Sequence, residues 1–136
     1  MAESMCVHFA SATWDDIARR LDQWAIGSGG EYWHYPDTDD YLVLLYEYAD
    51  HATELEPEVF GRLCDLLGRR PASALCLELR RSKGRAAHDA ATGLARGFLR
   101  EFKGVVEGIS GSVYWSLADL ESGAAGRDAD RWWPHD

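Results

Sequence analysis

The 136-residue sequence has no long apolar run and few cysteines. Its longest apolar stretch, residues 41–46, is far shorter than the roughly 18 residues of a membrane span, so we expect a strand there. The three cysteines, Cys6, Cys64 and Cys76, are odd in number and widely spaced, which is typical of small core residues in a reducing compartment. The first nine residues lack the basic and apolar regions of an export signal. These absences together predict a cytoplasmic protein.

Motifs for catalysis and metal binding are missing as well. No two histidines lie three to five residues apart, and neither Cys-x-x-Cys nor His-Glu-x-x-His occurs, so we expect no metal site and no cofactor. The Gly-x-Ser-x-Gly motif is absent, and the glycine-rich residues 27–30 follow a predicted helix, the reverse of a phosphate loop. We therefore predict that the protein is not an enzyme. The alternative is a hydrolase that pairs His34 or His51 with a carboxylate, but the spacing selects no such pair.

Basic residues are absent from residues 31–58. This segment contains nine acidic residues and no Lys or Arg, so it carries a charge of -9, equal to the net charge of the whole chain. Residues 59–110 contain ten basic and five acidic residues, a balance of +5. The negative net charge argues against direct binding of nucleic acid, which depends on cations. The uneven distribution favours a cationic partner.

The acidic segment also contains five of the six tyrosines. Tyr and Trp provide large contact areas at low entropic cost and are frequent in binding hot spots. We therefore predict a partner-binding surface centred on the turn at residues 36–40 and the loop at 50–58. Trp33 and Tyr35 are expected to be exposed, whereas the alternation of Tyr41, Tyr46 and Tyr48 fits a core position equally well. The predicted partner-binding residues are Trp33, Tyr35, Asp37, Asp39, Asp40, Glu47, Asp50, Glu54, Glu56 and Glu58.

Hydrophobic periodicity and turn residues divide the chain into short elements. Thr13, Pro57 and Ser82 are expected near helix starts, and Gly68 at a helix end. The elements are strands at 6–9, 31–35, 41–49, 74–81, 105–109 and 112–117, and helices at 14–26, 57–67 and 84–103. The order β-α-β-β-α-β-α-β(β) predicts an α+β fold, a two-layer sandwich with a mostly antiparallel sheet and about three helices. We expect one domain over residues 1–122 and a loose C-terminal tail, including Trp132 and Trp133, over residues 123–136.

A basic cluster supports a second interpretation. Arg80, Arg81, Lys83 and Arg85 lie where a predicted strand leads into a predicted helix. Cations at a helix N-terminus are suited to hold an anion. The alternative function is therefore a small-molecule or anion-binding regulatory domain that uses this corner.

The sequence also resembles bacterial immunity proteins of polymorphic toxin and contact-dependent growth inhibition systems, which are often small, acidic, cytosolic α+β domains. The resemblance extends over roughly residues 5–122 and is one of general character. It rests on the segments at 14–17, 32–35, 41–48, 77–82 and 113–117. It implies a stoichiometric inhibitor whose acidic surface blocks the cationic active site of a cognate toxin, such as a nuclease. It identifies no subfamily and implies no catalytic residues.

Overall fold

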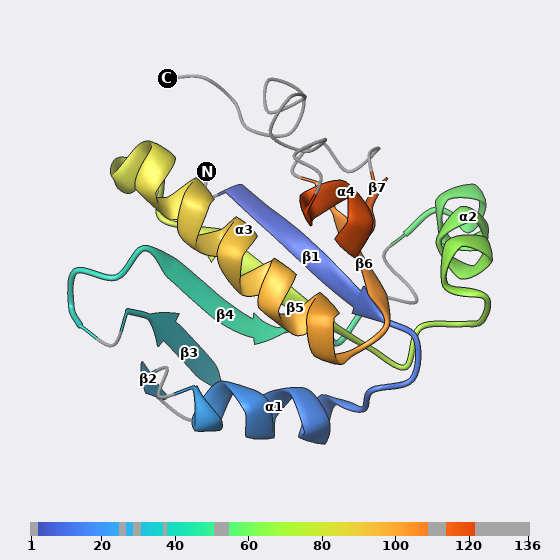
Figure 1. The fold of residues 1–136 in the computed structure, drawn as a ribbon, viewed down its shortest axis with the longest axis horizontal. Helices are drawn as coiled ribbons and strands as arrows, with labels where there is room; N and C mark the ends of the chain where they lie inside the picture. Colours follow the sequence, from blue (N-terminus) through green and yellow to red (C-terminus); the bar gives the residue numbers. More distant parts are fainter. Residues whose placement is uncertain are drawn as a thin grey trace.

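A computed structural model describes residues 3–24, 27–28, 31–36, 38–50, 55–108 and 114–121. Within these residues seven strands form one sheet in the order β2-β3-β4-β5-β1-β6-β7, and each neighbouring pair is antiparallel (Figure 1). The strands are β1 (Glu3–Phe9), β2 (Gly27–Ser28), β3 (Tyr32–Tyr35), β4 (Val43–Glu47), β5 (Ser73–Leu79), β6 (Gly104–Glu107) and β7 (Tyr114–Trp115). The helices are α1 (Trp14–Gln23), α2 (Pro57–Leu67), α3 (Gly84–Glu101) and α4 (Leu117–Glu121), with a 3-10 turn η1 at Arg81–Lys83. The predicted α+β class is confirmed.

Three helices form a layer on one face of the sheet. Figure 1 shows α3 lying over the middle of the sheet, along β5, with α1 and α4 on the same side. The small residues Ala87, Ala91 and Ala95 recur at helical spacing and are fully buried, so α3 can lie close to the strands. Phe9 of β1 meets Phe98 of α3 edge-on, with ring centroids 5.9 Å apart. This apolar layer contains most of the hydrophobic core.

Local signals in the sequence place several helix ends correctly. Thr13 forms a capping box with Asp16, because its hydroxyl accepts from the Asp16 amide and the Asp16 carboxylate accepts from the Thr13 amide. Pro57 is the first residue of α2, where its missing N–H costs no hydrogen bond. Gly68 follows α2 with φ of +77°, a left-handed conformation that favours glycine.

Other predicted boundaries are wrong. Helix α1 ends at Gln23 rather than at residue 26; Trp24 is its C-cap residue, donates to the Arg20 carbonyl and packs its ring on Phe98. Ser82 does not cap α3, since η1 intervenes and Lys83 occupies the N-cap position without a side-chain bond. Strand β4 covers five residues rather than nine. The last hairpin is followed by α4, which the sequence analysis missed.

Some predictions fall outside the described residues. These are the loose tail at 123–136 with Trp132 and Trp133, two predicted partner-binding residues, Asp37 and Glu54, and the alternative catalytic residue His51. Among the helices that the structure describes, none has the length and apolar character needed to cross a membrane.

Gly104 is expected to be intolerant of a side chain. A Cβ there would collide with the backbone carbonyl of His8 and lie 3.0 Å from the Leu99 side chain. Gly104→Ala should therefore lower the free energy of unfolding by about 1–3 kcal/mol. Gly93 is the matched control, because a Cβ there has nothing within 4 Å and the residue lies inside α3. Gly93→Ala should raise the stability by about 0.5–1 kcal/mol, and urea unfolding of both variants would show opposite signs.

Candidate functional site

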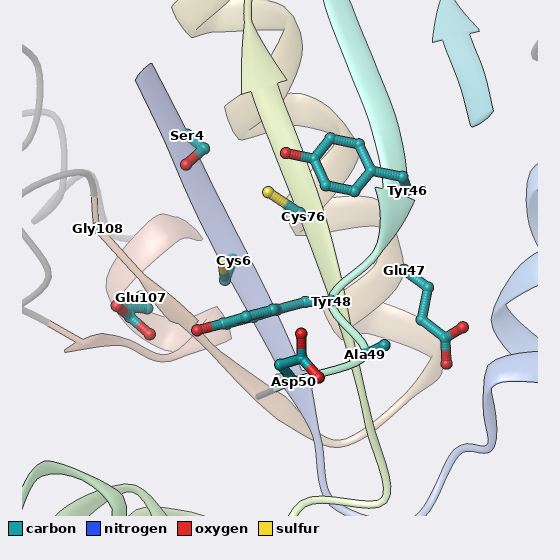
Figure 2. A pocket seen from close by; sticks show the side chains of 10 residues that line it. All are labelled: Ser4, Cys6, Tyr46, Glu47, Tyr48, Ala49, Asp50, Cys76, Glu107 and Gly108. Atoms are coloured by element: carbon teal, nitrogen blue, oxygen red, sulfur yellow. The ribbon is translucent and has the colours of Figure 1, made fainter. Parts of the chain in front are cut away.

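The second face of the sheet is covered at one end by α2. There Leu63 and Leu67 pack with Ala10 and Val105 in a small apolar cluster. Beyond this cluster the face is hollowed by a cleft of about 490 Å³ (Figure 2). We call it the open-face cleft; it is lined by Ser4, Cys6, Tyr46, Glu47, Tyr48, Ala49, Asp50, Cys76, Glu107 and Gly108.

A row of directly opposed residues crosses six strands on this face. Residues paired across neighbouring strands point to the same side of a sheet. The register therefore places six residues side by side on this face. In the order β3, β4, β5, β1, β6 and β7 they are Tyr32, Tyr46, Cys76, Cys6, Glu107 and Tyr114. We call these residues the cross-strand row. They join parts of the chain that are up to 108 positions apart, and four of the six line the open-face cleft.

Tyrosines form one side of the open-face cleft. Tyr32 and Tyr46 meet edge-on, with ring centroids 5.5 Å apart. Figure 2 shows the Tyr46 hydroxyl pointing toward the Cys76 sulfur and the Tyr48 ring extending toward Glu107. The pKa of Tyr46 is raised, chiefly by burial, so its hydroxyl stays protonated and remains a donor at neutral pH. These rings offer flat contact area beside carboxylates.

Three acidic residues line the cleft. Its lining includes Glu47, Asp50 and Glu107. An adjoining hollow of about 380 Å³ shares Tyr46 and Glu47 with the cleft and adds Glu31. Among the described residues that line these two hollows there is no Lys or Arg. Such a surface attracts a cationic group.

Glu107 is positioned by a buried histidine. His8 is fully buried in β1, two residues along the same face from Cys6. Its Nε2 donates to the Glu107 Oε1 at 2.9 Å, since a carboxylate accepts hydrogen bonds. This bond fixes one carboxylate at the edge of the cleft.

The predicted acidic turn lies against the predicted basic corner. Asp40 forms ion pairs with Lys83 and, at 3.9 Å, with Arg80. Arg80 also donates to the carbonyls of Asp39 and Tyr41, at 3.1 and 3.3 Å. The hydrogen bond and charge of Lys83 hold the pKa of Asp40 below its ordinary value. Two of the four proposed anion-binding cations therefore already contact an acid of the same chain.

The other predicted site residues are dispersed. Arg81 and Arg85 are exposed, and Arg85 approaches the His88 ring at 3.4 Å. Glu56 and Glu58 are exposed at the start of α2, and Tyr35 is exposed beside the turn, as expected. Of the predicted partner-binding residues that the structure describes, Glu47 and Asp50 are the two charged ones that line the cleft. Glu47 lies at its rim, where its side chain points away from Cys6 and Cys76 and toward the adjoining hollow (Figure 2).

The expected exposure of Trp33 is wrong. Its side chain is 5% exposed and belongs to the core between the sheet and α1. Its Nε1 donates to Asp22 Oδ1 at 2.9 Å, and its ring meets Trp14 edge-on at 5.9 Å. The physical reason is strand alternation, because Trp33 pairs with the buried Leu45 and therefore faces the helices. Tyr32, its neighbour, faces the other side and is 49% exposed.

The sequence analysis did not predict that Cys6 and Cys76 lie next to each other. Cys6 and Cys76 are directly opposed in β1 and β5, and neither of them forms a disulfide in the structure. Hydrogen bonds from Cys6, Tyr46 and Ser4 stabilise the thiolate against the effect of burial and lower the pKa of Cys76 to about 7. The sequence carries no signal for this pairing, since the two residues are 70 positions apart. Within the described residues, no three His, Cys, Asp or Glu side chains are grouped to hold a metal ion.

Comparison of the chain with protein-family models, with curated proteins and with solved structures gave no significant match. The fold and site together define a small acidic α+β domain in which one face of an antiparallel sheet carries helices and the other carries an acidic, tyrosine-lined cleft.

Proposed function

We propose that this chain is a cytoplasmic immunity protein that binds and neutralises a cognate cationic toxin domain, of which a nuclease is the type that fits best. The observation that carries the proposal is the acidic lining of the two adjoining hollows, with four carboxylates and no Lys or Arg among the described residues that line them. The active site of a nuclease is cationic because it must attract phosphates. The four carboxylates, two in strands and two near strand ends, present negative charge of the kind that such a site binds.

The tyrosines support the same function. Tyr32, Tyr46 and Tyr48 lie on the acidic face of the sheet and present ring surface next to the carboxylates. Aromatic anchors surrounded by complementary charge are the usual composition of a tight protein interface. The proposed binding surface is accordingly the open-face cleft with its adjoining hollow, more than the turn at residues 36–40. The partner is a protein, with no direct contact to nucleic acid or membrane.

The test uses the gene that precedes this one. Its product, or the C-terminal domain of that product if it is long, is expressed from a tightly controlled promoter with and without this chain. We expect growth arrest in the absence of this chain and restored growth in its presence. We also expect the two purified proteins to elute as one complex in size-exclusion chromatography.

The control is a second, unrelated toxin domain of similar positive charge. This chain should neither restore growth against it nor form a stable complex with it, because specificity requires matched shape as well as charge. The proposal fails if the preceding gene encodes no toxic domain, or if toxicity and elution are unchanged by this chain.

A further inference from the structure

Cys6 and Cys76 lie directly opposite each other in the sheet. They are direct partners in the antiparallel pairing of β1 with β5, and hydrogen bonding by Cys6 is the main influence that lowers the pKa of Cys76. Opposed residues in such a pair have Cα atoms about 4.5–5.5 Å apart. A disulfide spans Cα separations of about 4.4–6.8 Å. The backbone already holds the two residues at a separation that a disulfide can bridge.

Both thiols also line a cavity that a small molecule can enter. They lie within the open-face cleft of about 490 Å³, with Ser4 and Tyr46 on either side. Cys64 provides a contrast, because it lies on α2 and does not line this cleft. The cross-strand pair is therefore distinguished from the third cysteine by its direct partner and by its position in the cleft, since Cys76 is itself buried and Cys64 is partly exposed.

We propose that Cys6 and Cys76 are an oxidation site at which a hydroperoxide converts the two thiols into a disulfide between β1 and β5. The Cys76 thiolate attacks the terminal peroxide oxygen, the O–O bond breaks, and the leaving oxygen takes up a proton as water or an alcohol. Cys76 becomes a sulfenic acid. The Cys6 sulfur then attacks the Cys76 sulfur, the S–O bond breaks, and hydroxide leaves with the Cys6 proton as water. One peroxide is reduced and two thiols are oxidised.

The surroundings assign the first step to Cys76. It receives hydrogen bonds from Cys6, Ser4 and Tyr46, which favour the thiolate, while burial and the charge of Glu78 oppose it. The thiolate is the form that reacts with peroxide. Because the resulting pKa is about 7, the thiolate fraction of Cys76 is substantial at neutral pH. The peroxide reaction should accelerate as the pH rises through about 7 and level off above it.

The experiment treats the folded full chain with hydrogen peroxide and follows intact mass and peptide linkage. Wild type and Cys64→Ser should both lose about 2 Da, the mass of two thiol hydrogens, and digestion should yield a peptide pair joined through Cys6 and Cys76. Cys6→Ser cannot close the disulfide, so Cys76 should accumulate as a sulfenic acid that dimedone labels. Cys76→Ser should react at least tenfold more slowly than wild type. Far-UV circular dichroism checks that each variant is folded.

Wild type and Cys64→Ser decide the outcome, since neither disturbs the cleft. The proposal is overturned if both retain free Cys6 and Cys76 while other side chains oxidise, or if the linkage formed joins two molecules or involves Cys64. It is also overturned if dimedone labels Cys6 in preference to Cys76. None of these outcomes depends on toxin binding, so this proposal and the immunity function stand or fall separately.

Discussion

Replacing Trp33 by alanine should lower the free energy of unfolding by about 3–5 kcal/mol, the usual cost of removing a large buried aromatic side chain. Trp33 is 5% exposed, packs edge-on to Trp14, and donates a hydrogen bond to Asp22. Its loss would leave a cavity between β3 and α1, because the surrounding core cannot fully collapse into the space. Denaturant unfolding followed by far-UV circular dichroism measures the effect.

Tyr32→Ala is the matched control for Trp33→Ala. Tyr32 is the adjacent residue of β3, faces the opposite side of the sheet, and is half exposed. Its loss removes one edge-on contact with Tyr46, so we expect a decrease in stability of about 0.5–1.5 kcal/mol. If the two variants lost equal stability, the assignment of Trp33 to the core would be wrong.

Reversing Glu47 and Asp50 to lysine should weaken binding of the proposed toxin partner by about 2–5 kcal/mol, the usual loss when a charge that becomes buried in an interface is removed. Both carboxylates line the open-face cleft, where no described lining residue is a Lys or Arg. Two added cations would repel a cationic partner and would remove the attraction that speeds its approach. Wild-type association should slow steeply as salt increases, and the double variant should lose most of that dependence. Surface plasmon resonance at several ionic strengths measures both quantities.

The control is the same reversal at Asp39 and Asp40. These residues carry the same charge, but Asp40 already pairs with Lys83 and Arg80 of this chain. Their reversal should change the affinity less than tenfold and the stability by at most about 1 kcal/mol, the range of exposed ion pairs. If this control weakened binding as much as the cleft variant, the partner would contact the turn, as the sequence alone had suggested. Thermal melting of both variants shows whether either change unfolds the protein.

Local sequence signals were enough to place most elements. The capping box at Thr13, the proline at position 57 and the glycine at position 68 act within one helical turn, so the sequence reports them directly. The alanine stripe of α3 similarly predicts its buried face. Some predicted boundaries were wrong, as at the end of α1, where the C-cap residue Trp24 packs on Phe98 of α3.

The candidate site was only partly predictable. The acidic and tyrosine-rich composition of residues 31–58 does not depend on the structure and can be read from the sequence. Which residues of this segment share a face of the sheet depends on the strand register. A shift of one residue would place Tyr32 in the core and Trp33 on the open face. The neutralisation of Asp40 by Lys83 likewise joins two positions that are 43 residues apart.

The sequence by itself determined the charge, the helix ends that carry local caps, and the α+β class, because these depend on composition and on neighbours a few residues away. Only the tertiary structure decided that Glu107, Cys6 and Cys76 join Tyr46 on one face of the sheet. That arrangement results from pairing β1 with β5 and β6, strands that are distant in the chain. No periodicity within a single strand specifies its partner or its register, so the acidic cleft and its thiol pair exist only once the sheet is assembled.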